Sequence, residues 1–232
     1  MAVDLRGVTT VLLPGTGSDD DYVYRAFSGP LRMVGALLVS PPPQPDRLID
    51  GYLSALEAAA LKGPIAVGGV SIGAAVAAAW ALAHPDHVIA VLAALPAWAG
   101  PPGTAPAALA ARHSASQLRA DGLAATTTQM RASSPPWLAD ELARSWRAQW
   151  PQLPDAMEEA AAYVAPSCAE LTRLAAPLGV AAAVDDPIHP LQVGVEWVTA
   201  APRAALRTVT LDQIGTDPAA LGAACLAALA EL

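Results

Sequence analysis

The sequence predicts an α/β fold, with a mainly parallel central sheet, flanking helices and a helical cap insertion. Along most of the 232 residues, short apolar runs alternate with helical stretches, which is typical of parallel strands covered by helices. Several of these runs are apolar throughout rather than alternating with polar residues, as expected for strands buried on both faces. The alternation stops in the middle of the chain, which indicates an insertion.

Six strands are expected. They are the apolar runs at residues 8–13, 33–39, 65–70, 88–95, 179–184 and 206–211. The best-marked helices cover residues 46–61, where Leu48, Leu53 and Leu56 share one stripe, and the C-terminal stretch after Asp217. Asp217 is a suitable N-cap with proline following at the first helical position, and Cys225 falls on the apolar face of this last helix.

Residues 99–168 are expected to form a helical cap, or lid, inserted into a core made of residues 1–98 and 169–232. The segment opens with a Gly-Pro-Pro-Gly cluster, which breaks regular structure. Four helical patterns follow with no strand between them, at about 105–120, 122–132, 136–150 and 154–164. A simpler interpretation is that these helices only cover one edge of the sheet.

Composition excludes several classes of protein. The formal net charge of -8 argues against nucleic acid or an anionic membrane surface as the main partner. Residues 63–85 carry no Asp, Glu, Lys or Arg and approach the length of a membrane span. Several glycines interrupt them, so we expect a strand, a turn and a helix and no membrane span. Two isolated cysteines indicate a reducing, cytoplasmic setting rather than a disulfide framework.

The strongest chemical signal is Gly69-Val70-Ser71-Ile72-Gly73, which follows an expected strand and opens an expected helix. A nucleophile on such a sharp turn needs small neighbours, and the turn presents the Ser71 hydroxyl above the sheet. The backbone N–H of Ile72, at the start of the helix, is free to bind an oxyanion. The alternative is a tight turn that simply requires glycines.

Two further loops are expected at the same edge of the sheet. Gly15 and Thr16 lie in a glycine-rich turn after the first strand, where the Thr16 N–H can reach the same oxyanion. The run Asp19-Asp20-Asp21 follows, and helix capping explains it better than a metal site, because no histidine is near in sequence. No dinucleotide or GK[ST] phosphate pattern occurs, so no cofactor and no metal are expected.

The third loop, after the strand at 179–184, contains Asp186 and His189. Asp186 can orient a base, or it can serve only as a turn residue. His189 can approach Ser71, or it can pack beside the loop prolines. Residues 84 and 87, both histidines, flank the far end of the helix after Ser71. His113 belongs to the expected lid.

Together these motifs resemble the α/β-hydrolase superfamily over nearly the whole chain. The resemblance implies Ser71 as nucleophile, Asp186 as acid, and the Thr16 and Ile72 N–H groups, beside Gly15, as oxyanion donors. It also implies a histidine after the last strand, but the chain has Gly215-Thr216 there and no histidine after His189. The usual base is therefore missing from its place, and His189 is the candidate replacement because it shares the loop of Asp186.

The sequence favours a serine hydrolase that acts on an ester or thioester with an apolar part, through a degenerate or relocated base. The alternative is a catalytically impaired protein of this fold that binds a small apolar ligand or a partner. A nucleotide-binding domain ranks lower, for want of a phosphate motif. The sequence does not predict the oligomeric state.

Overall fold

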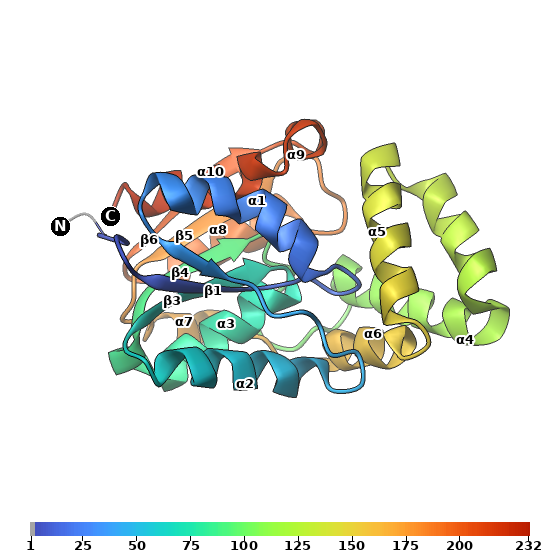
Figure 1. Ribbon diagram of the computed structural model, residues 1–232, viewed down its shortest axis with the longest axis horizontal. Helices are drawn as coiled ribbons and strands as arrows, with labels where there is room; N and C mark the ends of the chain where they lie inside the picture. Colours follow the sequence, from blue (N-terminus) through green and yellow to red (C-terminus); the bar gives the residue numbers. More distant parts are fainter. Residues whose placement is uncertain (1–2) are drawn as a thin grey trace.

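A six-stranded, fully parallel sheet forms the centre of the protein, in the computed structural model that describes residues 3–232 (Figure 1). The strand order is β2-β1-β3-β4-β5-β6, which confirms the predicted fold class. The strands are β1 (Thr9–Leu13), β2 (Leu37–Val39), β3 (Ile65–Val70), β4 (Val88–Ala94), β5 (Leu178–Ala183) and β6 (Ala204–Val209).

Helices cover both faces of this sheet (Figure 1). Helices α1 (Asp20–Met33) and α10 (Ala219–Leu229) pack on one face, and α2 (Leu48–Ala60), α3 (Ile72–Ala83) and α8 (Leu191–Ala200) pack on the other. Within β1, Val11 and Leu13 enter one core while Leu12 enters the other. Burial on both faces explains the unbroken apolar runs of the sequence.

The uncharged stretch at residues 63–85 folds as β3, a turn and α3, all within this layered core. Helix α3 is buried along most of its length by the sheet and the neighbouring helices. Between residues 3 and 232, no helix is both long enough and apolar enough to cross a lipid bilayer.

The insertion between β4 and β5 is helical. It contains α4 (Pro106–Ser133), α5 (Pro136–Gln149), α6 (Leu153–Ala162) and α7 (Cys168–Leu171). The described residues 105–164 include no strand, as predicted. Helix α4 contains two of the expected helices, separated by a kink at Gly122, whose backbone angles are not helical (φ 78°, ψ 172°). Figure 1 shows α4, α5 and α6 gathered at the end of the sheet farthest from the chain termini.

Two expected strands differ from the structure by two to four residues at an end, and three others differ by a single residue at one or both ends. The strand expected at 33–39 begins only at Leu37, because α1 continues to Met33 and a turn at Gly35 (φ 73°) then ends it. The strand expected at 206–211 ends at Val209, because Thr210 caps the short helix α9 (Leu211–Thr216). In both places a local helix-ending or helix-starting signal outweighs the apolar pattern.

Helix α2 takes its N-terminal cap from the insertion. Its own N-cap residue, Arg47, makes no capping hydrogen bond through its side chain. Instead the Glu159 carboxylate of α6 accepts hydrogen bonds from the backbone N–H groups of Leu48 (2.8 Å) and Ile49 (3.3 Å). A carboxylate at this end of a helix also interacts favourably with the helix dipole. Glu159 therefore ties the insertion to the core.

Replacing Glu159 with alanine should lower the free energy of unfolding by about 1 kcal/mol, the usual cost of losing a helix cap. The control is Glu158→Ala on the same helix, which removes only an exposed ion pair with Arg119 and should cost less than about 0.5 kcal/mol. Urea denaturation of both variants measures the difference. Equal losses in the two variants would contradict the capping role of Glu159.

Candidate active site

Ser71 lies at the sharp turn between β3 and α3, with backbone angles φ 54° and ψ −114°. A positive φ is unusual for a residue other than glycine, so the surrounding structure must hold this strained conformation. The Ser71 N–H donates to the carbonyl oxygen of Ala94 at 2.9 Å, and the Ser71 carbonyl accepts from the Ala75 N–H at 3.2 Å. The residue is 7% exposed.

The glycines on either side of Ser71 are required by close backbone packing. A Cβ atom on Gly69 would collide with the carbonyl oxygen of Leu13, and one on Gly73 would lie 2.8 Å from the carbonyl oxygen of Pro14. The end of β1 therefore presses directly on the turn. A Cβ atom on Gly15 would lie only 3.6 Å from the Ser71 Cβ, so the glycine-rich turn after β1 lies against Ser71.

Three side chains form a hydrogen-bonded chain at this edge of the sheet. His189 Nε2 is 3.0 Å from Ser71 Oγ, and His189 Nδ1 is 2.8 Å from Asp186 Oδ2. The side chains of His189 and Asp186 are 17% and 8% exposed. The structure thus brings together the serine, histidine and carboxylate that the sequence singled out, with the imidazole between the other two.

The loop after β5 holds Asp186 and His189 in this arrangement. The second carboxylate oxygen of Asp186 accepts the backbone N–H groups of Ile188 (2.8 Å) and His189 (3.2 Å). Burial tends to raise the pKa of Asp186, but the hydrogen bonds from His189 and the loop backbone outweigh it, so the pKa lies below its usual value. The preceding Asp185 accepts the N–H of Leu211 at 2.8 Å, which anchors the loop to α9.

The other histidines lie away from this site. His84, at the end of α3, stacks on the Trp80 ring with the ring centroids 4.4 Å apart. His87 is exposed in a 3₁₀ turn (Pro85–His87), and His113 is exposed on α4.

The resemblance implies a histidine after the last strand, where this chain has Gly215 and Thr216. Gly215 and Thr216 are the last two residues of α9. A Cβ atom on Gly215 would overlap the ring of Trp137, which belongs to α5. The insertion therefore packs closely on α9 there, and no histidine belongs to that short helix.

The two expected oxyanion donors belong to the segments on either side of the Ser71 turn, the start of α3 and the turn after β1. Ile72 is the first residue of α3, where a backbone N–H has no partner inside the helix. Thr16 follows Gly15 in the turn that contacts Ser71. The roles of Thr16, Ile72 and Gly15 in holding an oxyanion remain predictions.

Asp19, the first of the three consecutive aspartates, accepts the Tyr22 N–H at 3.0 Å and caps α1, as the sequence indicated. Within the described part of the chain, no three His, Cys, Asp or Glu side chains are grouped to hold a metal ion.

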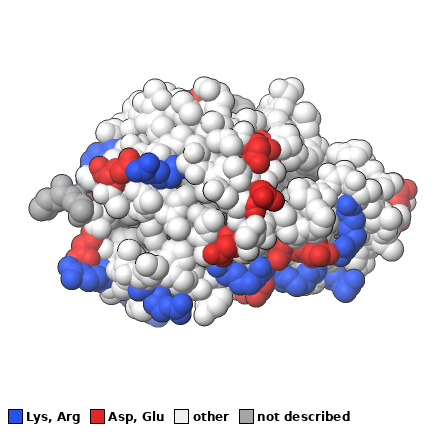
Figure 2. All heavy atoms as spheres, turned by 90° about the horizontal axis from the view of Figure 1, so that it is seen from above, with Lys and Arg blue, Asp and Glu red and all other residues white. Residues whose placement is uncertain are grey.

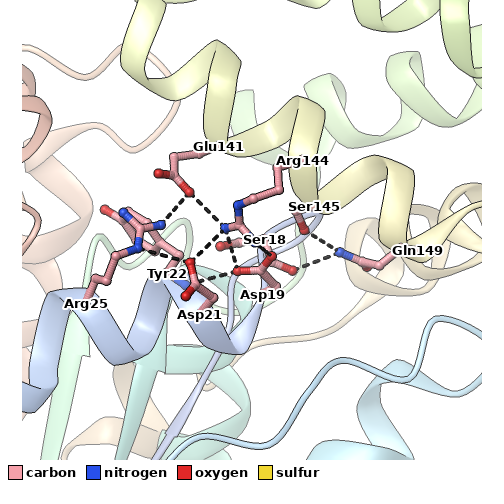
Figure 3. A network of polar contacts seen from close by, with 9 residues as sticks. All are labelled: Ser18, Asp19, Asp21, Tyr22, Arg25, Glu141, Arg144, Ser145 and Gln149. Carbon is pink, nitrogen blue, oxygen red and sulfur yellow. Dashed lines mark hydrogen bonds and ion pairs between the residues drawn. The ribbon is translucent and has the colours of Figure 1, made fainter.

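Sequence reasoning missed the polar contacts between the insertion and the turn after β1. Arg144 and Gln149 of α5 bind Asp19 and the Ser18 carbonyl (Figure 3). Five of the twelve arginines fall within the insertion, but their sequence positions do not reveal which one faces the core.

A parallel sheet with helices on both faces, a serine in a strained strand-to-helix turn and a helical insertion after the next strand together define a known class. The chain has the α/β-hydrolase fold. No model of a known protein family matches the sequence, and neither does any curated protein.

Solved structures show the same fold at low sequence identity. A hydrolase from Pseudomonas aeruginosa PA01 is 22% identical, with a TM-score of 0.67 over 96% of this chain and 90% of that chain. A thermophilic esterase from Thermogutta terrifontis is 18% identical, with a TM-score of 0.66 over 88% of this chain and 82% of that one. An enol-lactonase from Burkholderia xenovorans LB400 is 18% identical, with a TM-score of 0.65 over 89% and 84%.

The strain at Ser71 can be measured without any activity. Glycine relieves a positive φ that alanine does not, so Ser71→Gly should be more stable to unfolding than Ser71→Ala by about 1 kcal/mol. The matched control is exposed Ser116 within α4, where alanine should instead be more stable than glycine by about 1 kcal/mol. Thermal or urea unfolding measures the stability of the four variants. If alanine is more stable than glycine at position 71, as at position 116, Ser71 is unstrained.

Proposed function

We propose that this protein is a serine hydrolase that cleaves an ester or thioester with an apolar acyl part. The observation that carries the proposal is the 3.0 Å contact between His189 Nε2 and Ser71 Oγ, with Asp186 bound to the other ring nitrogen. This arrangement matches the roles of nucleophile, base and orienting acid in acyl transfer. In this proposal His189 is the base, a role that the hydroxyl of Thr216 cannot fill near neutral pH.

In the acylation step, the Ser71 hydroxyl gives its proton to His189 Nε2 while Oγ forms a bond to the carbonyl carbon. The carbonyl oxygen becomes an oxyanion, held by the N–H groups of Thr16 and Ile72. His189 then transfers its proton to the leaving alcohol or thiol as the bond to the carbonyl carbon breaks. A water molecule repeats the sequence, giving a proton to His189 and its oxygen to the acyl carbon, and the proton returns to Ser71 as the acid is released.

Asp186 fixes the tautomer of His189. Its lowered pKa keeps the carboxylate ionised near neutral pH, so it accepts the Nδ1–H and leaves Nε2 free to take the serine proton. The charge also stabilises the imidazolium that forms during the reaction.

The helical insertion is the lid in this proposal. Ser71 is buried, and α4, α5 and α6 lie at its end of the sheet (Figure 1), so the substrate enters when the lid moves. Two structures that share the fold, an esterase and an enol-lactonase, are in keeping with the proposal, because both names denote enzymes that act on ester-type bonds.

Short p-nitrophenyl esters test the assignment. His189→Ala should lower kcat/KM by about 10²–10⁴, the usual contribution of a general base, and Ser71→Ala should remove labelling by a fluorophosphonate probe. His113→Ala and Thr216→His are matched controls and should stay within about twofold of the wild type, because neither position joins the chemistry in this proposal. Turnover that is insensitive to His189→Ala would refute the assignment. Ligand binding without any turnover would favour an impaired hydrolase that serves as a binding protein.

A further inference from the structure

Helix α5 is bound to the turn that follows β1 through three consecutive residues of that turn. The contacted residues are Gly17, Ser18 and Asp19, which come directly after Gly15 and Thr16. Each contact uses a different side chain of α5, and two of the three are polar (Figure 3).

Asp19 makes the strongest of these contacts. Arg144 donates from its two terminal nitrogens to the two carboxylate oxygens of Asp19, at 2.5 and 3.0 Å. A bidentate pair of this kind fixes both the distance between the two side chains and their relative orientation. Asp19 is buried, and Arg144 also bonds to Glu141 at 2.9 Å, which holds the guanidinium in place.

The pair is part of a wider network that joins α1 to α5. Glu141 also accepts from Arg25 of α1 at 2.6 Å, and Arg25 bonds to Asp21 at 3.0 Å. Figure 2 shows basic and acidic side chains lying beside one another along one edge of the face in view, rather than in separate patches. At this junction Arg25 and Arg144 each form an ion pair across it, with Glu141 and Asp19 respectively.

Ser18 is held through its backbone. The Gln149 side chain, itself buried, donates to the carbonyl oxygen of Ser18 at 2.9 Å and lies 2.7 Å from the Ser145 hydroxyl. Burying these polar groups is favourable only while they stay paired. The bond therefore fixes the path of the chain next to Thr16.

Gly17 is covered by an aromatic ring. It has a positive φ of 69°, and a Cβ atom at this position would lie 2.7 Å from the indole nitrogen of Trp146. Trp146 is buried within a small core formed by the insertion, among Leu118 and Met157. The ring therefore rests directly on the backbone of the turn.

We infer that α5 is a positioning element for the oxyanion turn, in which Arg144 holds Asp19 and thereby sets the direction of the Thr16 N–H. This inference rests on the proposed function, because it assigns Thr16 as an oxyanion donor. The turn touches Ser71 at Gly15 and touches α5 from Gly17 onward, so Thr16 is fixed from both sides. The geometry of the oxyanion site then depends on the contacts between α5 and the turn.

The central test is Arg144→Gln compared with Arg119→Gln. Both variants remove one positive charge, but among residues 3–232 Arg119 pairs with Asp155 and Glu158, which also belong to the insertion. Loss of a whole oxyanion donor lowers kcat by about 10²–10³, so a misdirected donor in Arg144→Gln should lower kcat by about tenfold. KM should stay within about twofold in Arg144→Gln. Both constants should stay within about twofold of the wild type in Arg119→Gln.

A double-mutant cycle with Asp19→Asn isolates the pair. Asparagine retains the oxygen that caps α1 but loses the charge that Arg144 binds. If the two residues act through each other, Asp19→Asn with Arg144→Gln should be no slower than Arg144→Gln alone. If the double variant instead shows the product of the kcat losses of the two single variants, the inference is overturned.

Two further measurements separate failure of this inference from failure of the proposed function. Fluorophosphonate labelling of Ser71 in the wild type tests the function, and unchanged labelling and kcat in Arg144→Gln overturns the inference alone. The backbone amide resonance of Thr16 reports the turn independently of activity. A shift in Arg144→Gln but not in Arg119→Gln supports positioning by α5, and identical spectra overturn it even if the wild type is not labelled.

Discussion

The close approach of the ends of β1 and β3 is the constraint on which the site depends. These strands are neighbours in the sheet, with Leu13 paired to Gly69. The backbone of Leu13 leaves no space for a side chain at Gly69 or Gly73. The same packing holds Ser71 in its strained turn and sets the glycine-rich turn after β1 beside it. A serine and a set of backbone N–H groups thus meet because two strand ends are pressed together.

The loop after β5 completes the arrangement. Asp186 and His189 are three residues apart, and the carboxylate binds both the imidazole and the backbone N–H of His189. The proposed acid and base therefore form one locally fixed unit. The segment after β6 forms α9, which packs against Trp137 of the insertion.

Much of the fold could be predicted because the strands are buried on both faces and the turns carry strong local signals. Ile65–Val70 is a strand with the boundaries expected from its apolar run, and Ser71 has the strained backbone that its flanking glycines indicate. The orientation of His189 could not be predicted, because it depends on hydrogen bonds from the loop to Asp186. The bonds of Glu159 to α2 and of Gln149 to Ser18 join segments more than 100 residues apart, and no local pattern encodes them.

Chemical rescue tests the central claim, that His189 acts as the base for Ser71, most directly. The rate of Ser71 phosphonylation by a fluorophosphonate is measured in His189→Ala while free imidazole is added. We predict a slow rate that rises with imidazole concentration towards the wild-type rate, because the small cavity left by the side chain admits the missing base, and no labelling in Ser71→Ala. A His189→Ala variant that is labelled at the wild-type rate without imidazole would contradict the account.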